Sequence, residues 1–472
     1  MMASTSLRID SNPFEAIDSG RFSEAQTAID KNKIPKPLTH IAAAELALYF
    51  GRFAEAETAL NNAGPVSGDI WLASRFALAE GELLFARQNF SSAKKRFNAA
   101  FHFSEFLGDQ FSLALAVYRI SRILSAQGQQ EEAIRMLHEA YEGLRGQGAK
   151  AEFMRGLLDF QLAVCELQSG HSLEAVQLYR SAIDSLKESE RGRYYALVLI
   201  SHGIVQRDSG NLPQAQESFE EAMNVLSRQN IFGELASCIC ELATVLIRSR
   251  SYERAERLLT ECLALYKRAE NTDGEARSLT LMAQIELDRN RPRKVREHAQ
   301  RAFELADAAK DPQVATAARI QLARSSTLEK DRAKSVELLE EALKIAKDRG
   351  LVDQGIEAHI YLAELYHGFD PLKGPAHLEA AGNILKEHAN PVMEAELSRV
   401  SQKYQSGRIW REGSKLIFDS NLLPNWYEAK KSLEVFLLKG ALDQTGQNLT
   451  EAGKLLGISK VHVHDKRKQY QI

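Results

Sequence analysis

Apolar, small and polar positions repeat along most of this chain with a period of about 40 residues. Few β-branched residues stand in alternating runs, so the pattern favours helices over strands. The central column of small or helix-punctuating residues is Ala93, Ala133, Ala175, Ala215, Ala255, Val295, Ser335 and Pro375. Twelve residues earlier stand Gly81, Ser121, Ala163, Gly203, Ala243, Ala283, Ala323 and Ala363, and seven residues later Ala100, Ala140, Ala182, Ala222, Cys262, Ala302, Ala342 and Gly382. Because small residues let two antiparallel helices approach closely, the columns predict eight stacked helical hairpins.

Bulky side chains complete each predicted hairpin. Four residues after the central column stand Phe97, Leu137, Tyr179, Phe219, Leu259 and Leu339. We expect these side chains to fill the groove beside the small residues. Two divergent units precede the eight, because residues 19–29 and 50–60 are near-copies of each other. About ten hairpins are therefore expected between residues 12 and 390, and a closing helix over 391–405 would cover the last apolar face.

These columns resemble those of tetratricopeptide repeats, in which a small residue ends the packing ridge of the first helix and an Ala opens the second. The unit here is longer than the roughly 34 residues of that family, so each helix gains most of a turn. The resemblance implies an all-α, right-handed superhelical solenoid. HEAT and armadillo repeats share the period but do not predict these columns, and they remain the second interpretation.

The last 25 residues carry a different pattern, which predicts two short helices joined by a tight turn. Asn448 suits the N-cap of the first helix, and Glu451 three residues later would complete a capping box. Gly457 suits the left-handed residue that ends this helix. Ser459 suits the N-cap of the second helix, which runs nearly to the end of the chain.

These patterns divide the chain into three parts. Residues 1–405 are expected to form the repeat array with its closing helix, 406–424 a linker and 425–472 a small C-terminal domain. Within the linker, residues 408–418 are expected to form a short extended segment that docks the C-terminal domain on the array.

The C-terminal segment from about Trp426 resembles the Fis-type helix-turn-helix that closes many bacterial regulators. Its matching motifs are a leading helix over 434–442, then Thr445-Gly-Gln-Asn448, Glu451-Ala452, Leu455-Leu-Gly-Ile-Ser459 and the ending Tyr470-Gln-Ile472. The resemblance implies that the last helix enters the major groove of double-stranded DNA. It places two residues at phosphate and six on the side that faces the groove. In chain order these eight are Asn448, Thr450, Ser459, Lys460, His462, His464, Lys466 and Lys468.

Three positions depart from the Fis-type pattern. Asp465 stands where the family usually has Lys or Arg, and an acid there would repel phosphate. Arg467 stands where the family usually has the Leu that anchors the last helix to the core, and His462 replaces a commoner Thr. A second interpretation therefore stays open, in which this domain has become a packing or dimerisation module.

Charge is distributed unequally along the chain. From Trp426 onward eight Lys or Arg residues oppose five Asp or Glu residues, so this segment carries +3 while the whole chain carries −3. A basic segment on an acidic body is typical of proteins in which only that segment meets nucleic acid. Three extra charges alone should bind DNA weakly, and pairing two copies in a homodimer would double the contact surface and match a two-fold operator.

The remaining composition narrows the class. The 472-residue chain has no apolar run near 18 residues and no signal-peptide pattern at its start, so we expect a cytoplasmic protein that does not enter membranes. Its four cysteines show no C-x-x-C spacing and are expected to be reduced core residues. Nucleotide-binding loops and the motifs of zinc proteases and serine hydrolases do not occur. We therefore expect no enzyme, no catalytic residues, no cofactor and no metal site.

The inner wall of the predicted solenoid is the candidate binding surface. Residues that lie six and three positions before, and one and four after, each small residue of the first helices should point inward. They include Arg75, Tyr118, Arg122, Arg207, Arg277, Gln284 and Arg324. Arginines on an acidic body suit an acidic peptide, a carboxylate or a phosphate. The alternative is that these arginines pair with glutamates of adjacent hairpins, as Glu82 and Glu241 would permit.

Together these patterns predict a bacterial regulator. Its solenoid would bind a protein or peptide partner, and the partner would control a DNA-binding C-terminal domain. The main alternative is a scaffold or adaptor that does not bind DNA, in which the C-terminal domain serves dimerisation. A receptor for a peptide pheromone is a third interpretation.

Overall fold

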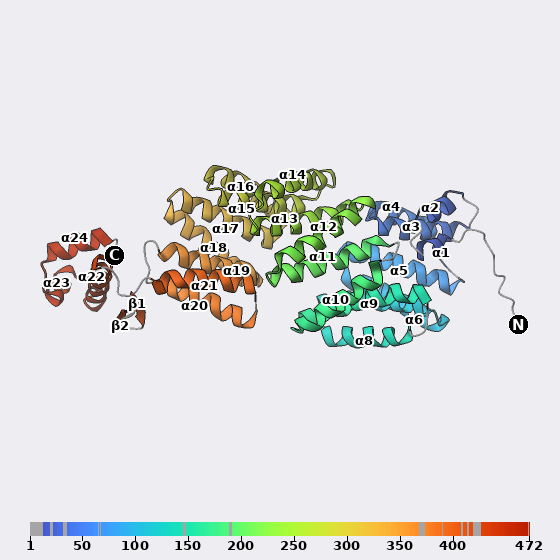
Figure 1. The fold of residues 1–472 in the computed structure, drawn as a ribbon, viewed down its shortest axis with the longest axis horizontal. Helices are drawn as coiled ribbons and strands as arrows, with labels where there is room; N and C mark the ends of the chain where they lie inside the picture. The colour runs from blue at the N-terminus through green and yellow to red at the C-terminus, as the bar shows by residue number, and fades with distance from the viewer. Residues whose placement is uncertain are drawn as a thin grey trace. The chain divides into compact units, whose positions relative to one another are not determined.

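The computed structural model describes residues 13–18, 22–31, 35–64, 66, 68–144, 148–187, 191–367, 373–388, 390–406, 409–412, 415–418, 426–470 and 472. Contacts divide the chain into two compact units, 1–281 and 282–472. The described part is almost entirely helical (Figure 1). No helix among the described residues is long and apolar enough to cross a membrane.

The first unit is built from paired helices. They are α1 (Pro13–Asp18), α2 (Phe22–Asp30), α3 (Lys36–Tyr49), α4 (Phe53–Ala63), α5 (Ile70–Ala86), α6 (Phe90–Leu107), α7 (Gln110–Ala126), α8 (Gln130–Gly143), α9 (Gly148–Gln168), α10 (Ser172–Lys187), α11 (Gly192–Asp208), α12 (Leu212–Arg228), α13 (Phe232–Arg248), α14 (Tyr252–Arg268) and the start of α15 (Thr272–Asp288). Consecutive helices such as α5 and α6 or α9 and α10 pack against each other as hairpins (Figure 1).

The second unit continues with hairpins and ends in a smaller group of elements. Its helices after α15 are α16 (Pro292–Ala309), α17 (Pro312–Leu328), α18 (Arg332–Arg349), α19 (Val352–His367), α20 (Gly374–Glu387) and α21 (Pro391–Ser406). The remaining elements are β1 (Ile409–Glu412), β2 (Lys415–Phe418), α22 (Trp426–Gln444), α23 (Leu449–Leu456) and α24 (Lys460–Tyr470). The predicted stack of helical hairpins is confirmed.

The small-residue columns lie where the helices of a hairpin touch. Ala93, Ala133, Ala175, Ala215 and Ala255 are all fully buried. The sizes of facing side chains are also matched within a hairpin. Two of the eight units have Phe four residues after the central column, and the same two units have Gly twelve residues before that column.

Each of these glycines lies directly against the phenylalanine of its own hairpin. A Cβ atom on Gly81 would lie 2.5 Å from the Phe97 ring, and one on Gly203 would lie 2.8 Å from the Phe219 ring. A real Cβ does not approach an aromatic carbon this closely, because optimal carbon contacts lie at 3.5–4.0 Å. The glycines therefore make room for the larger partner.

In the last hairpin the predicted register is wrong by one residue. Gly374 and Ala381 are buried there, whereas Pro375 is exposed and Gly382 is only half-buried. The physical reason is a close approach by Tyr404 of α21, whose hydroxyl would lie 1.6 Å from a Cβ on Gly374. The small residue thus stands one position before the predicted one.

Helix α21 covers the end of this hairpin. It packs against α19 and α20, and its Val400 is fully buried. The Tyr404 hydroxyl donates a hydrogen bond to the Ala363 carbonyl oxygen of α19. After α21, β1 and β2 pair antiparallel, with Ile409 opposite Phe418, and β1 contacts α21. Part of the predicted extended segment, including Arg408, lies outside the described residues.

Three helices close the second unit around a small core. Leu438 and Leu442 of α22, Ala452 of α23 and Val463 of α24 are all buried in it. The two caps of the last turn agree with the sequence, because Asn448 accepts hydrogen bonds from the first turn of α23 and the Ser459 hydroxyl accepts one from the backbone of α24.

The turn between α23 and α24 also has the predicted left-handed glycine. Gly457 has a φ of 68° and forms the C-cap of α23. The capping box is present only in its N-cap half, since the Glu451 carboxylate pairs with Lys454 at 2.9 Å. At Gly453 a Cβ would lie 2.7 Å from the Ile458 carbonyl oxygen, so the turn approaches α23 too closely for a side chain there.

Candidate functional site

A polar cavity of about 310 Å³ lies among the first helices of several hairpins in the first unit. Its wall combines Phe85 of α5, Tyr118 and Arg122 of α7, Phe160 of α9 and Tyr194 of α11. Binding pockets for small ligands have volumes of roughly 300–1,000 Å³ and combine apolar walls with a few polar groups. This cavity has the size and the composition of such a pocket.

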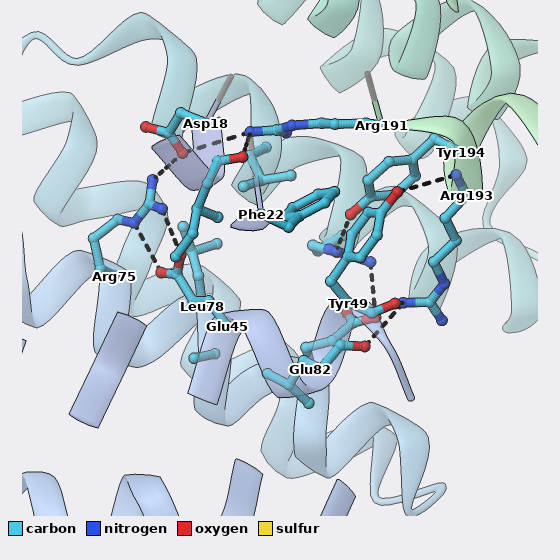
Figure 2. A pocket seen from close by; sticks show the side chains of 15 residues that line it. Asp18, Phe22, Glu45, Tyr49, Arg75, Leu78, Glu82, Arg191, Arg193 and Tyr194 are labelled. Carbon is cyan, nitrogen blue, oxygen red and sulfur yellow. Dashed lines mark hydrogen bonds and ion pairs between the residues drawn. The ribbon is translucent and has the colours of Figure 1, made fainter. Parts of the chain in front are cut away.

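Figure 2 shows a second, smaller cavity of about 90 Å³. The two cavities share Glu82, Arg119, Arg193 and Tyr194. The rest of the polar wall of the smaller cavity comes from the N-terminal hairpins, including Asp18, and from Arg191 just before α11. The two cavities are thus neighbours that share part of their walls.

The smaller cavity is closed by contacts between segments far apart in the sequence. Arg193, at the start of α11, donates hydrogen bonds to the carbonyl oxygens of Leu48 and Tyr49 at 2.9 and 2.8 Å. The Tyr49 hydroxyl accepts a hydrogen bond from the backbone of Arg193 and donates one to Gln229. In a regular solenoid each repeat contacts only its neighbours. Here the end of α3 instead contacts a hairpin about 145 residues later.

Glu82 supplies the negative charge of the larger cavity. Its Oε1 atom pairs with Arg119 at 2.8 Å and with Arg122 at 3.5 Å. Burial would raise the pKa of Glu82, but Arg119, Arg122 and Arg193 more than offset it and hold the pKa below its usual value. The other carboxylate oxygen, Oε2, is buried and has no hydrogen-bond partner within the described part of the chain.

Among the predicted groove residues, Arg75 is part of the fold. Its side chain is 4% exposed, and it pairs with Glu45 of α3 at 2.5 Å and with Asp18 of α1 at 2.9 Å (Figure 2). Burial would lower the pKa of Arg75, but the two carboxylates outweigh it and raise the pKa. Arg75 thus holds the N-terminal hairpins together and has few donors left for a ligand.

Arg122 and Tyr118 lie at the cavity. The Arg122 guanidinium stacks 4.2 Å from the centre of the Phe85 ring, and its side chain is 28% exposed. Tyr118 is buried beside it. Because the Arg122–Glu82 contact is long and Glu82 is shared with Arg119, Arg122 keeps donors that face the cavity.

The other four predicted groove residues do not line this cavity. Arg207 pairs with Asp208 at 2.8 Å and with Glu241 of the next hairpin. Arg277 is half-exposed and pairs with Asp273 on its own helix at 3.1 Å. In the second unit, Arg324 donates to the Gln284 amide oxygen at 2.6 Å and stacks on Tyr361. The alternative predicted from sequence, pairing with glutamates of adjacent hairpins, thus describes Arg75 and Arg207, and in part Arg122.

In the C-terminal helices seven of the eight predicted DNA contacts are exposed, namely Asn448, Thr450, Ser459, Lys460, His462, His464 and Lys468. Two of these seven also cap helices, since the Asn448 side chain caps α23 and the Ser459 hydroxyl caps α24. The eighth, Lys466, is half-buried and pairs with Glu434 of α22 at 2.6 Å. This pair raises the pKa of Lys466, mainly through the hydrogen bond to Glu434.

The three departures from the Fis-type pattern, His462, Asp465 and Arg467, all lie on α24. Asp465 is exposed, so its charge lies at the surface with the lysines. Arg467 is half-buried, and its Nε donates to the Ile472 carbonyl oxygen at 2.9 Å. Arg467 therefore fixes the end of the chain to α24 through a hydrogen bond, where the family has an apolar anchor.

One surface group could be compared with a metal site. The ligand atoms of Glu166, His171 and Glu174 lie within 4.8 Å of one another. His171 Nδ1 lies 2.6 Å from a Glu166 oxygen, and this hydrogen bond raises the pKa of His171. A metal would have to displace the proton that the hydrogen bond stabilises. We therefore interpret this group as a surface ion pair.

Comparisons with known proteins support the class that the hairpins define, an array of tetratricopeptide repeats. The protein-family model described as tetratricopeptide repeat matches residues 235–308. No curated protein matches the chain. Among solved structures, a Rap protein in complex with competence and sporulation factor is similar, with 13% identity, a TM-score of 0.53, and coverage of 72% of this chain and 97% of that one.

Two further solved structures align over much of the chain. The apo quorum sensor NprR from B. thuringiensis has 14% identity and a TM-score of 0.49, covering 72% of this chain and 99% of that one. The Rap conjugation gene regulator of plasmid pLS20, in complex with the Phr* peptide, has 13% identity and a TM-score of 0.46, covering 83% and 98%. At such sequence identities a structural similarity shows only the fold. The fold assignment rests on the Rap complex, whose TM-score is the highest of the three.

Several residues of the cavity were not predicted from the sequence. Arg119, Arg193 and Tyr194 belong to none of the three columns, and Arg193 follows the short segment between two hairpins. Their role depends on the contact with Tyr49, which lies 144 residues earlier. A repeat pattern carries no signal for such a contact, because it reports only what neighbouring units share.

Proposed function

We propose that this chain is a transcriptional regulator. Its first unit binds an acidic peptide or an acidic segment of a protein in the cavity beside Arg122, and its last three helices bind double-stranded DNA. The proposal assigns it no catalytic step and no cofactor. The observation that carries it is the cavity itself, where Arg122 is half-buried, stacked on Phe85 and incompletely paired.

The charge of the larger cavity favours an anion. Three arginines line it, namely Arg119, Arg122 and Arg193, against Glu82. Arg193 is matched by Glu234 of the next hairpin, so one guanidinium charge remains without a carboxylate of its own. A carboxylate can bind an arginine through two parallel hydrogen bonds, which makes it the matching group on a ligand.

A peptide fits the rest of the wall better than a simple anion does. A peptide with an acidic side chain offers a carboxylate to Arg122 and also backbone N–H and C=O groups to the rest of the wall, whereas a simple anion offers only the first. Gln161 and Gln168 line the same cavity and offer amide groups to a backbone. The Rap protein of similar fold was solved in complex with competence and sporulation factor, which shows that such a hairpin array accommodates a binding partner.

The peptide part of the proposal is tested with the full chain and a defined probe. A pool of short fluorescent peptides, each with one Asp or Glu, is compared by anisotropy with the same pool carrying Asn or Gln. We expect the acidic pool to bind tighter and Arg122→Ala to remove the difference. Arg277→Ala is the matched control, because this arginine pairs on the surface of its own helix. Equal binding of both pools, or full binding by the Arg122→Ala variant, would contradict the proposal.

The DNA part rests on the helical geometry of the last unit together with its resemblance to Fis-type domains. The exposed Lys460 and Lys468 would contact phosphate, so each Lys→Ala change should reduce the salt slope of duplex binding by roughly 1. Asp465→Lys should tighten binding, most clearly at low salt. Lys466 is already paired with Glu434, so Lys466→Ala should lower the stability of the C-terminal helices and leave the salt slope of duplex binding almost unchanged.

One observation favours the alternative, a C-terminal domain that serves dimerisation. Leu433 and Leu437, one helical turn apart on α22, are 43% and 46% exposed, and Val461 on α24 is 68% exposed. If this apolar surface pairs two copies, Leu433→Lys should yield a monomer in sedimentation measurements. Loss of dimers with DNA affinity unchanged would separate pairing from DNA binding.

If the full chain and its Asp465→Lys variant both fail to shift duplex DNA at ~50 mM salt, the scaffold interpretation replaces the regulator.

A further inference from the structure

Two cysteines of the first unit face each other inside one hairpin. Cys240 lies on α13 and Cys262 on α14, and their Sγ atoms are 3.5 Å apart. The hydroxyl of Ser278 on α15 is 3.5 Å from each sulfur. Because a disulfide has an S–S distance of about 2.05 Å, the sulfurs need to approach by about 1.5 Å, which a side-chain rotation can provide.

The repeat pattern does not explain two sulfurs at these positions. Cys262 stands in a column where the other seven units have Ala or Gly. The equivalents of Cys240 in the other units are Leu78, Tyr118, Phe160, Ile200, Thr280, Ile320 and Ile360. Packing is thus satisfied elsewhere by one larger side chain against one small one, and this hairpin alone among the eight has a thiol at both positions.

The surroundings distinguish Cys240 from the other cysteines. A hydrogen bond from Cys262 lowers the pKa of the Cys240 thiol, against the burial that would raise it, and Ser278 contributes in the same direction. In contrast, burial raises the pKa of Cys238 to about 12, and it raises the pKa of Cys165. Cys240 is 8% exposed while Cys262 is fully buried. Cys240 is therefore the less buried residue and the more readily ionised thiol of the pair, and Cys262, with its sulfur 3.5 Å away, is positioned to react with it.

We propose that Cys240 and Cys262 form a reversible disulfide when the protein meets hydrogen peroxide. In the first step the Cys240 thiolate attacks one peroxide oxygen, so an S–O bond forms, the O–O bond breaks, and the hydroxide that leaves takes up a proton to become water. In the second step the Cys262 sulfur attacks the Cys240 sulfur. The S–S bond forms, the S–O bond breaks, and the second hydroxide leaves as water with the Cys262 proton. A thiol reductant restores both cysteines.

This link joins the two helices of one hairpin. It closes a loop between residues 240 and 262, which restricts the unfolded chain and stabilises the folded hairpin. We expect the oxidised protein to melt several degrees higher than the reduced protein, with an unchanged circular dichroism spectrum.

The test uses the full reduced chain and hydrogen peroxide as the probe. After treatment the protein is denatured, free thiols are alkylated, and the remaining disulfide is located by peptide mass mapping. We expect the wild-type protein to lose two of its four free thiols and to yield one peptide pair that contains Cys240 and Cys262. The matched controls Cys238→Ser and Cys165→Ser should still form this pair.

The two single variants of the pair separate the steps. Cys262→Ser should stop at the first step, leaving a sulfenic acid on Cys240 that a 1,3-diketone reagent labels, whereas Cys240→Ser should form neither product. The proposal is overturned if wild-type protein retains four alkylatable thiols, or if the mapped disulfide involves Cys165 or Cys238. The disulfide map of the wild-type protein is sufficient to test the proposal, so the test does not depend on whether the variants fold.

Discussion

The contact between Gly203 and Phe219 allows one substitution to be worked out in advance. In Gly203→Ala the new Cβ would lie 2.8, 3.0 and 3.1 Å from three atoms of the Phe219 ring. Ordinary carbon contacts lie at 3.5–4.0 Å, so the ring has to move by roughly 0.7–1 Å. Phe219 is fully buried, so its ring can move only against neighbouring side chains. The change therefore overpacks the hairpin interface.

Two opposing effects set the size of this change. Overpacking a well-packed core costs about 1–3 kcal/mol. Replacing Gly with Ala in a helix interior gains about 1 kcal/mol through helix propensity. We expect Gly203→Ala to lower the free energy of unfolding by about 0–2 kcal/mol, which is about 1–3 kcal/mol below a Gly→Ala change that meets no neighbour. Gly233→Ala is the control in the same unit, since no atom lies within 4 Å of its new Cβ. That variant should be neutral or slightly more stable.

The assay is urea unfolding followed by circular dichroism, with Phe219→Leu and the double variant completing a thermodynamic cycle. A smaller side chain at position 219 leaves room for the new methyl group, so the double variant should be destabilised by about 1 kcal/mol less than the sum of the single changes. Additive effects, or a Gly203→Ala variant as stable as Gly233→Ala, would show that the two helices are not in the contact described here.

Three further changes test other parts of the structure. Arg75→Ala removes the closest partner of two mostly buried carboxylates, Glu45 and Asp18, and leaves Asp18 with the longer contact to Arg191 at 3.6 Å, so it should cost about 3–5 kcal/mol in urea unfolding. Arg87→Ala, which removes an exposed ion pair, is the control and should leave the unfolding midpoint almost unchanged. Burial, and then His377, lower the pKa of His359 to about 4, so the unfolded chain binds more protons below its usual pKa. Wild-type stability should therefore fall between about pH 6.5 and 4, and His359→Asn should show a smaller fall in thermal melts across that range. Gly453→Ala would bring a Cβ to 2.7 Å from a backbone oxygen of the last turn, and it should unfold the C-terminal helices and remove any DNA binding seen by anisotropy while the array keeps its melting transition.

The repeat columns predicted the hairpins because they report contacts between neighbouring helices. The small residue of each column lies in the hairpin interface, and its spacing is fixed by the length of the unit. The pattern was wrong at the last hairpin, where Gly374 rather than Pro375 is buried. There the neighbour is the closing helix α21, and Tyr404 requires the space of a missing side chain. A terminal unit packs against something that the repeat does not encode, so its register follows that partner.

The cavity could be predicted only in part. Tyr118 and Arg122 lie on a first helix at inward positions, and the sequence placed both in the candidate groove. The contacts that enclose the neighbouring space come from Tyr49 and Arg193, whose separation in the sequence exceeds three repeat units. Curvature accumulates over those units from small rotations at each interface. A local sequence pattern does not encode the accumulated rotation. The contact between distant hairpins is therefore seen only in the folded structure.

A ligand site in a repeat array is better located by matching charges than by counting arginines. Arg75 is held by two carboxylates and Arg207 by a further two, so neither has a charge left for a partner. Arg119 and Arg122 share the single carboxylate of Glu82, and Arg122 has the longer contact. Because burying an unmatched charge is costly, a guanidinium stays in such a place only where solvent or a ligand can reach it. The half-buried, singly paired Arg122 satisfies that condition, and a carboxylate brought by a peptide would complete the pairing that Glu82 leaves unfinished.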